Sequence, residues 1–109
     1  MILRHFIRPQ AEADIDDCVA YLEEQSSFEL ASRFLSAVES TIGFLYKTPL
    51  AGARYAPKKP RLKQLRTWPV QDFADIRIYY QLPDEATMRI IRVLHGKRNV
   101  KRILLKEDL

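Results

Sequence analysis

Two β-rich runs decide the fold of this chain: IRIYY at residues 76–80 and, after a short connection, RIIRVLHGKR at residues 89–98. The connection contains Pro83, Asp84, Glu85 and Ala86, and its proline and aspartate favour a turn. Two apolar runs separated in this way predict a pair of antiparallel strands. The second run ends in a His-Gly-Lys-Arg corner, so cationic side chains gather at the end of a strand.

Strand periodicity assigns side chains to faces. Over residues 75–82, one face carries Ile76, Ile78, Tyr80 and Leu82, and the other carries Arg77, Tyr79 and Gln81. Residues 87–95 are almost continuously apolar, which predicts a central strand with Arg89 and Arg92 on opposite faces by parity. Further strands are predicted at residues 3–7 and 62–68, with residues 69–74 as a connection and residues 49–61 as a loop.

Two amphipathic helices are predicted in the first half of the chain. Pro9 suits a first helical turn, and apolar residues then recur at helical spacing at Ile15, Cys18, Val19 and Leu22. Ser26 and Glu29 have the spacing of a capping box and predict the start of a second helix, which continues to Pro49 through Ala31, Phe34, Leu35, Val38, Ile42 and Leu45.

Helices this close in sequence pack antiparallel, and their apolar stripes need a further surface to cover them. The sequence therefore predicts an α+β fold in which an N-terminal strand and an antiparallel helical hairpin pack on a small, mainly antiparallel β-sheet. Residues 100–105 fit either a short helix or an extended segment.

Length and composition limit the class of protein. A chain of 109 residues predicts one domain over residues 1–109. No apolar run approaches the ~20 residues of a membrane span, and the N-terminus does not resemble a secretory signal. We therefore expect a cytoplasmic protein without membrane association. Cys18 is the one cysteine, which excludes an internal disulfide and favours a buried structural thiol.

Charge is distributed unevenly. Residues 1–53 carry 4 basic and 8 acidic side chains, whereas residues 54–109 carry 14 basic and 6 acidic ones. Such a basic half attracts polyanions, either nucleic acid or an acidic protein segment, and its alternative interpretation is a solvated surface.

Motifs for cofactor chemistry are missing from the sequence. His5 and His95 are far apart, no paired cysteines occur, and the three glycines are isolated, so we expect neither a metal nor a cofactor. The cationic sheet offers another chemistry, because arginine and lysine can hold a phosphate while histidine or tyrosine moves a proton. Each of these side chains could equally serve in structural pairing. The candidates are Lys63, Arg66, Arg77, Tyr79, Arg92, His95 and Arg98.

The chain as a whole resembles the RelE/ParE superfamily of bacterial toxin–antitoxin systems from about Leu3 to about Leu105. Four segments in the right order carry the resemblance: RPQAEADI at residues 8–15, YKTPLAG at 46–52, RIYY at 77–80 and VLHGKR at 93–98. The helical hairpin and the His-Gly-x-Arg ending are more typical of ParE-like members.

Resemblance to the ParE-like branch implies a growth-arresting toxin of a plasmid stabilization system that inhibits DNA gyrase by binding. It also implies a cognate ParD-like antitoxin whose C-terminal segment wraps across the helices and sheet, a hetero-oligomer of the two, and operator DNA bound only through the antitoxin. No catalytic residue is then expected. The candidates for contacting a partner or target are Arg77, Tyr79, His95, Lys97, Arg98, Lys101 and Arg102.

Two alternatives stay open. A RelE-type toxin would be a ribosome-dependent mRNA endoribonuclease, with Arg77 matching the arginine of the middle strand and His95 near the late proton-transfer position. Its catalytic candidates would be Lys63, Arg66, Arg77, Arg92 and His95. The other alternative is a toxin-like scaffold that has lost toxicity and only binds its partner.

Overall fold

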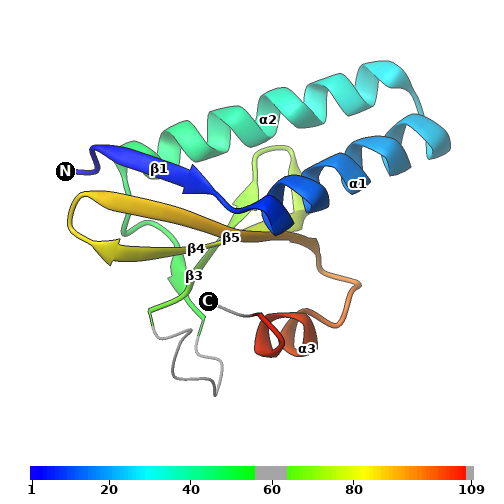
Figure 1. Ribbon diagram of the computed structural model, residues 1–109. Coiled ribbons are helices and arrows are strands. Elements are labelled where there is room, and N and C mark those ends of the chain that lie inside the picture. Colours follow the sequence, from blue (N-terminus) through cyan, green and yellow to red (C-terminus); the bar gives the residue numbers. More distant parts are fainter. Residues whose placement is uncertain (56–63, 108–109) are drawn as a thin grey trace.

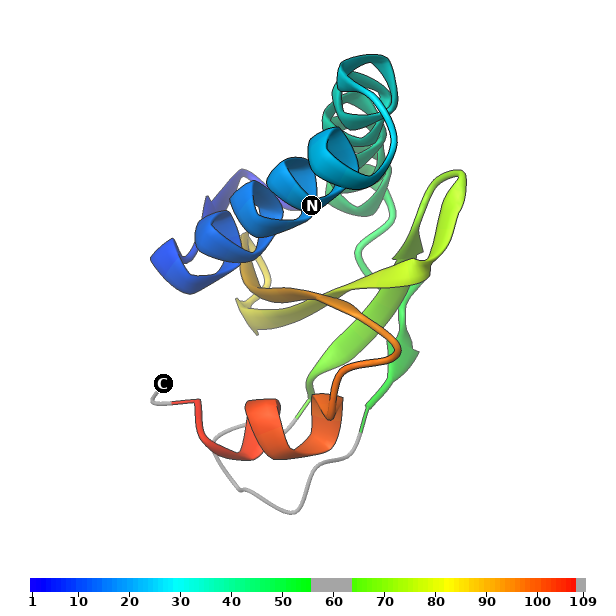
Figure 2. The ribbon, with the colours of Figure 1, turned by 90° about the vertical axis from the view of Figure 1, so that its right-hand side faces the viewer.

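Three layers make up the described part of the molecule. The computed structural model describes residues 1–55 and 64–107. Helices α1 and α2 cover one face of the sheet, and α3 lies against the other (Figures 1 and 2). In chain order the elements are β1 (Arg4–Ile7), α1 (Pro9–Gln25), α2 (Phe28–Lys47), β2 (Ala53–Arg54), β3 (Arg66–Val70), β4 (Phe73–Asp84), β5 (Thr87–His95) and α3 (Val100–Leu105).

The sheet has the strand order β1-β5-β4-β3-β2. Among the described strands, β1 and β5 pair in parallel and the other three pairs are antiparallel. The predicted α+β class with a mainly antiparallel sheet is therefore confirmed. The turn between the two long strands is Glu85–Ala86, where the Asp84 carboxylate accepts hydrogen bonds from the Ala86 N–H (2.8 Å) and the Thr87 hydroxyl (3.2 Å). These donors hold the pKa of Asp84 below its usual value.

Proline and serine residues mark the ends of the two long helices. Pro9 opens α1 directly after Arg8, as the sequence predicts. The capping box at Ser26 is wrong by one residue, because Ser27 caps α2 with its hydroxyl accepting from the Leu30 N–H at 3.0 Å. Ser26 instead ends α1 through its own N–H, which donates to the Leu22 carbonyl. No helix in the described part of the chain is long and apolar enough to cross a membrane.

Each face of the sheet has its own apolar core. The helix-side core contains Phe34, Leu45, Ile78, Tyr80 and Ile90, all fully buried. The smaller core beneath α3 consists of Leu65, Tyr79, Ile91, Leu94 and Leu104. The alternation predicted for β4 is confirmed, since Ile76, Ile78 and Tyr80 belong to the first core and Tyr79 to the second.

The strand boundaries differ from the prediction on the basic side of the sheet. The predicted connection 69–74 is mostly strand, because Pro69 and Val70 end β3, Phe73 starts β4, and only residues 71–72 form the turn. The predicted loop 49–61 contains the short strand β2. The strand predicted over residues 62–68 begins late, at Arg66, and residues 62–63 lie outside the described residues. Pro69 fits because β2 pairs only with Arg66 and Thr67, which leaves its position without a neighbour to receive an N–H.

A register shift in β5 changes which of its side chains share a face of the sheet. Tyr79 pairs with Arg92, whereas Tyr80 pairs with Ile90, so Ile91 is an extra residue in β5. Met88, Ile90 and Val93 therefore face the helices, while Ile91 and Leu94 face α3. The predicted opposition of Arg89 and Arg92 by simple parity does not hold across this bulge.

Candidate functional site

A charged network joins α1 to β5. The guanidinium of Arg92 donates to both carboxylate oxygens of Asp14, through Nε to Oδ2 at 2.7 Å and through Nη2 to Oδ1 at 2.8 Å. The backbone N–H of Val93 donates to the same Oδ2 at 3.0 Å. Asp14 is 4% exposed, so a buried carboxylate here has the partners that its desolvation requires.

Glu107 extends this network to the end of the described chain. Its buried carboxylate accepts from Arg92 Nη1 at 2.6 Å and from Arg8 Nη1 at 2.8 Å. Arg8 is also the N-cap residue of α1. The four side chains, Arg8, Asp14, Arg92 and Glu107, are called the clasp below, because they tie the segment that follows α3 to α1 and β5.

All three guanidinium nitrogens of Arg92 donate hydrogen bonds within the clasp. Its hydrogen bonds to Asp14 and Glu107 raise the pKa of the guanidinium above its usual value. Its side chain is only 12% exposed. Among the nuclease candidates, Arg92 is therefore held by two carboxylates and does not point into an open site.

Arg66 has a structural partner as well. Its Nη1 donates to the Gly52 carbonyl at 2.8 Å and to the Leu50 carbonyl at 3.3 Å. Next to it, the Tyr80 hydroxyl donates to the Pro49 carbonyl (2.6 Å) and accepts from the Gly52 N–H (2.9 Å). These contacts fix the segment between α2 and β2 against the sheet, and burial raises the pKa of Tyr80.

Arg77 and Tyr79 lie on the face of the sheet that α3 covers. Arg77 Nε donates to the Thr67 hydroxyl at 3.0 Å, and Tyr79 packs edge-to-face on Tyr55 with 5.5 Å between ring centroids. Tyr79 is only 4% exposed, and this burial raises the pKa of its hydroxyl. In the folded chain Tyr79 is therefore part of the core beneath α3 and not part of an exposed surface.

His95 lies on the other face. It pairs with Ile76, whereas Arg77 pairs with Leu94, and residues directly opposite each other in an antiparallel pair share a face. Ile76 belongs to the helix-side core and Leu94 to the core beneath α3. The sheet thus separates His95 from Arg77.

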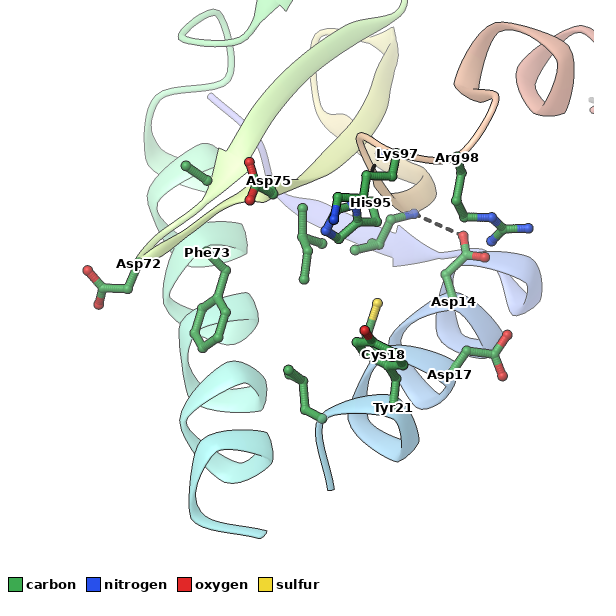
Figure 3. A pocket seen from close by; sticks show the side chains of 14 residues that line it. Asp14, Asp17, Cys18, Tyr21, Asp72, Phe73, Asp75, His95, Lys97 and Arg98 are labelled. Atoms are coloured by element: carbon green, nitrogen blue, oxygen red, sulfur yellow. Dashed lines mark hydrogen bonds between the residues drawn. The ribbon is translucent and has the colours of Figure 1, made fainter. Parts of the chain in front are cut away.

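A groove of about 560 Å³ opens beside His95, between α1 and the end of the sheet (Figure 3). Its apolar part comes from α1, the start of β4 and the end of β5, through Cys18, Leu22, Phe73, Ile76 and Val93. Lys97 and Arg98 line one end of it. His95 Nδ1 accepts the Lys97 N–H at 3.0 Å, which fixes the corner that carries these two cations.

Cys18 points its thiol into this groove (Figure 3). Burial, followed by the charges of Asp14 and Asp17, raises the pKa of the thiol to about 11. A thiol with so high a pKa is a poor nucleophile at neutral pH. Cys18 is only partly buried and lines the groove, so the predicted buried thiol is right only in part.

The remaining candidates lie outside the groove. Lys101 and Arg102 are exposed on α3, and Lys63 lies outside the described residues. In the part of the chain that the structure describes, no group of three or more His, Cys, Asp or Glu side chains could hold a metal ion. Among the candidates that the structure describes, His95, Lys97 and Arg98 are the ones that line the groove.

Comparison with known proteins gives the family. A family model described as ParE toxin of type II toxin-antitoxin system, parDE, matches residues 6–100. The chain belongs to this ParE toxin family. A chain of the chromosomal ParDE toxin–antitoxin system from P. aeruginosa has a similar structure, with a TM-score of 0.69 and 15% identity, and the match covers 86% of this chain and 96% of that chain. At this identity the likeness shows the shared fold. A comparison with curated proteins found no match.

Sequence reasoning about this ParE-family chain named only Arg92 as a candidate among the four clasp residues and missed Arg8, Asp14 and Glu107. Asp14 had a signal, because it lies three residues after Ala11 and one before Ile15, on the buried stripe of α1. A carboxylate at such a position requires a cationic partner. Glu107 had none, because it follows the last periodic residues and its contact with Arg8 spans 99 positions in the sequence.

Proposed function

We propose that this ParE-family chain arrests growth by binding and inhibiting DNA gyrase, and that a cognate ParD-like antitoxin neutralises it. Family membership supports the toxin role and the antitoxin partner. The proposal includes a hetero-oligomer of toxin and antitoxin that contacts operator DNA only through the antitoxin. The cytoplasmic location and the single domain over residues 1–109 stay predictions.

One observation favours binding over nuclease chemistry. Acid–base cleavage needs its proton-transfer group and its charge-stabilising group within reach of the same substrate atoms. Here His95 and Arg77 lie on opposite faces of the sheet. Arg66 and Arg92, which would complete a cationic site, donate instead to backbone carbonyls and buried carboxylates.

The exposed cations after β5 are the proposed target surface. Lys97, Arg98, Lys101 and Arg102 are all exposed, and none of them forms an ion pair within the described residues. Such charges raise the rate of encounter with an acidic partner surface. Arg77 and Tyr79 would contribute mainly by holding β4 and α3 in place.

The proposal is tested by the order in which replication and translation stop in cells and by a gyrase supercoiling assay in vitro. After induction, DNA cleavage and replication arrest should precede translation arrest, and the purified protein should inhibit gyrase supercoiling. Replacing His95 or Arg77 by alanine should lower toxicity by less than about tenfold, because no proton transfer is lost. Codon-specific mRNA cleavage on ribosomes that falls about 10²-fold or more in these variants would contradict the proposal and establish the RelE-type alternative.

A further inference from the structure

Helix α3 depends on contacts outside itself. It spans only Val100–Leu105, whereas an isolated helix needs roughly 12–15 residues to persist in water. The Asn99 side chain caps its start by accepting the Arg102 N–H at 3.2 Å, and fully buried Leu104 packs in the core beneath it (Figure 2). The Glu107 N–H donates to the Leu104 carbonyl at 3.1 Å. The Glu107 carboxylate and the last turn of α3 are therefore connected directly.

The clasp has two parts that join different elements. Arg92 and Asp14 share two hydrogen bonds, at 2.7 and 2.8 Å, which join β5 to α1. Glu107 accepts from Arg92 at 2.6 Å and from Arg8 at 2.8 Å, which joins the end of α3 to both elements. Without the Glu107 carboxylate, Arg92 would keep Asp14 as its partner. Loss of Glu107 should therefore free the end of α3 and leave the rest of the fold in place.

The four exposed cations after β5 are held in two different ways. Lys97 and Arg98 belong to the corner after β5, where their N–H groups donate to His95 Nδ1 and to the His95 carbonyl, both at 3.0 Å. These bonds do not involve α3. Lys101 and Arg102 lie on α3 itself. The position of the second pair relative to the first therefore depends on how firmly α3 is docked.

We propose that Glu107 is a positioning residue for target binding. By fixing the end of α3, its carboxylate holds Lys101 and Arg102 in one geometry beside Lys97 and Arg98, so that all four cations meet an acidic target surface together. A loose α3 would have to be ordered on binding, and the ordering of long side chains lowers affinity. This inference rests on the proposed binding of gyrase and adds the residue that organises the contact surface.

Charge and position predict opposite results for Glu107→Ala. The substitution makes the chain more basic by one unit, so charge alone would strengthen binding to an acidic target. If position governs, the concentration of purified toxin that half-inhibits gyrase supercoiling should rise about tenfold. Glu107→Gln keeps an acceptor for one arginine and should show a smaller rise. Glu24→Ala is the matched control, because it removes the same charge from an exposed position on α1, and it should change this concentration less than about twofold.

Two backgrounds show whether Glu107 acts through the cations of α3. In a Lys101→Gln/Arg102→Gln background, Glu107→Ala should cause no further loss of inhibition, since the side chains that it positions are changed. In a Lys97→Gln/Arg98→Gln background its effect should be retained, because that pair is held without α3. An equal further loss in both backgrounds would overturn the proposal, and so would stronger inhibition by Glu107→Ala.

Amide hydrogen exchange tests the contact itself, independently of gyrase. In Glu107→Ala the amides of α3 should exchange about tenfold or more faster, whereas those of β5 should keep their rates, because Arg92 keeps Asp14. Thermal melts should show that each variant folds. Unchanged exchange in α3 would overturn the proposal. If the unaltered chain does not inhibit gyrase, the proposed function fails, and the exchange rates still show whether Glu107 holds α3.

Discussion

The clasp and the groove each contain an aspartate of α1 and an arginine from β5 or the segment after it, yet these residues have opposite roles. Asp14 and Asp17 are three residues apart on α1, whereas Arg92 lies in β5 and Arg98 lies six residues later, in the segment that follows β5. Asp14 and Arg92 are buried and bonded to each other, whereas Asp17 and Arg98 are exposed and form no ion pair with a described residue. Whether a charge stabilises the fold or is available to a partner depends on its burial and bonding, which its residue type does not reveal.

Among pairs of residues of one type, two arginines are expected to differ most in their contribution to the free energy of unfolding. Arg92→Ala should lower the free energy of unfolding by about 3–5 kcal/mol, because it leaves the buried carboxylates of Asp14 and Glu107 without their common partner. Arg98→Ala removes an exposed charge and should change it by less than about 0.5 kcal/mol. Denaturant unfolding of both variants makes the comparison. Equal losses would show that the clasp does not stabilise the fold.

Two glycines are also expected to differ, and here replacement by alanine should lower the stability at one position and raise it at the other. At Gly52 an added Cβ would lie 2.5 Å from the Tyr80 hydroxyl, so Gly52→Ala should cost about 1–3 kcal/mol by displacing a buried, hydrogen-bonded ring. At Gly43, within α2, a Cβ would meet nothing within 4 Å, so Gly43→Ala should stabilise by about 0.5–1 kcal/mol. Thermal melts of the two variants should move in opposite directions. A destabilised Gly43→Ala variant would contradict the open surface that the structure shows there.

The neighbouring serines Ser26 and Ser27 should differ less in their contribution to the free energy of unfolding. Ser27→Ala should cost about 1 kcal/mol, because the hydroxyl that accepts the Leu30 N–H is lost from the start of α2. The Ser26 hydroxyl caps no helix end among the described residues, so Ser26→Ala should change the free energy of unfolding by less than about 0.5 kcal/mol. Chemical denaturation followed by circular dichroism distinguishes the two. A larger loss at Ser26 would restore the capping box that the sequence pattern suggested.

Periodicity in the sequence was sufficient for the main elements and insufficient for the contacts between them. The stripes of α1 and α2 and the alternation of β4 follow from which side chains avoid water, a local property of the chain. The bulge at Ile91, the short strand β2 and the choice of Ser27 over Ser26 depend on how neighbouring segments meet in space. The same holds for the site. Sequence could place cations near His95, but only the strand register shows that Arg77 faces away from it.

Cys18 lies near both the clasp and the groove, and the titration of its thiol is expected to have the smallest effect on stability. Its folded pKa of about 11 lies above the ordinary value of 9.0, so the folded chain keeps the thiol proton more tightly than the unfolded chain. Any stability that this difference contributes is present below pH 9 and is lost as the pH rises from 9 toward 11. Alkylation of the folded protein should accelerate about tenfold per pH unit from pH 7 to 10, and at pH 8 it should be about 100-fold slower than in guanidinium chloride. Equal rates in the folded and unfolded chains at pH 8 would mean that the thiol is more exposed, and farther from Asp14 and Asp17, than the structure places it.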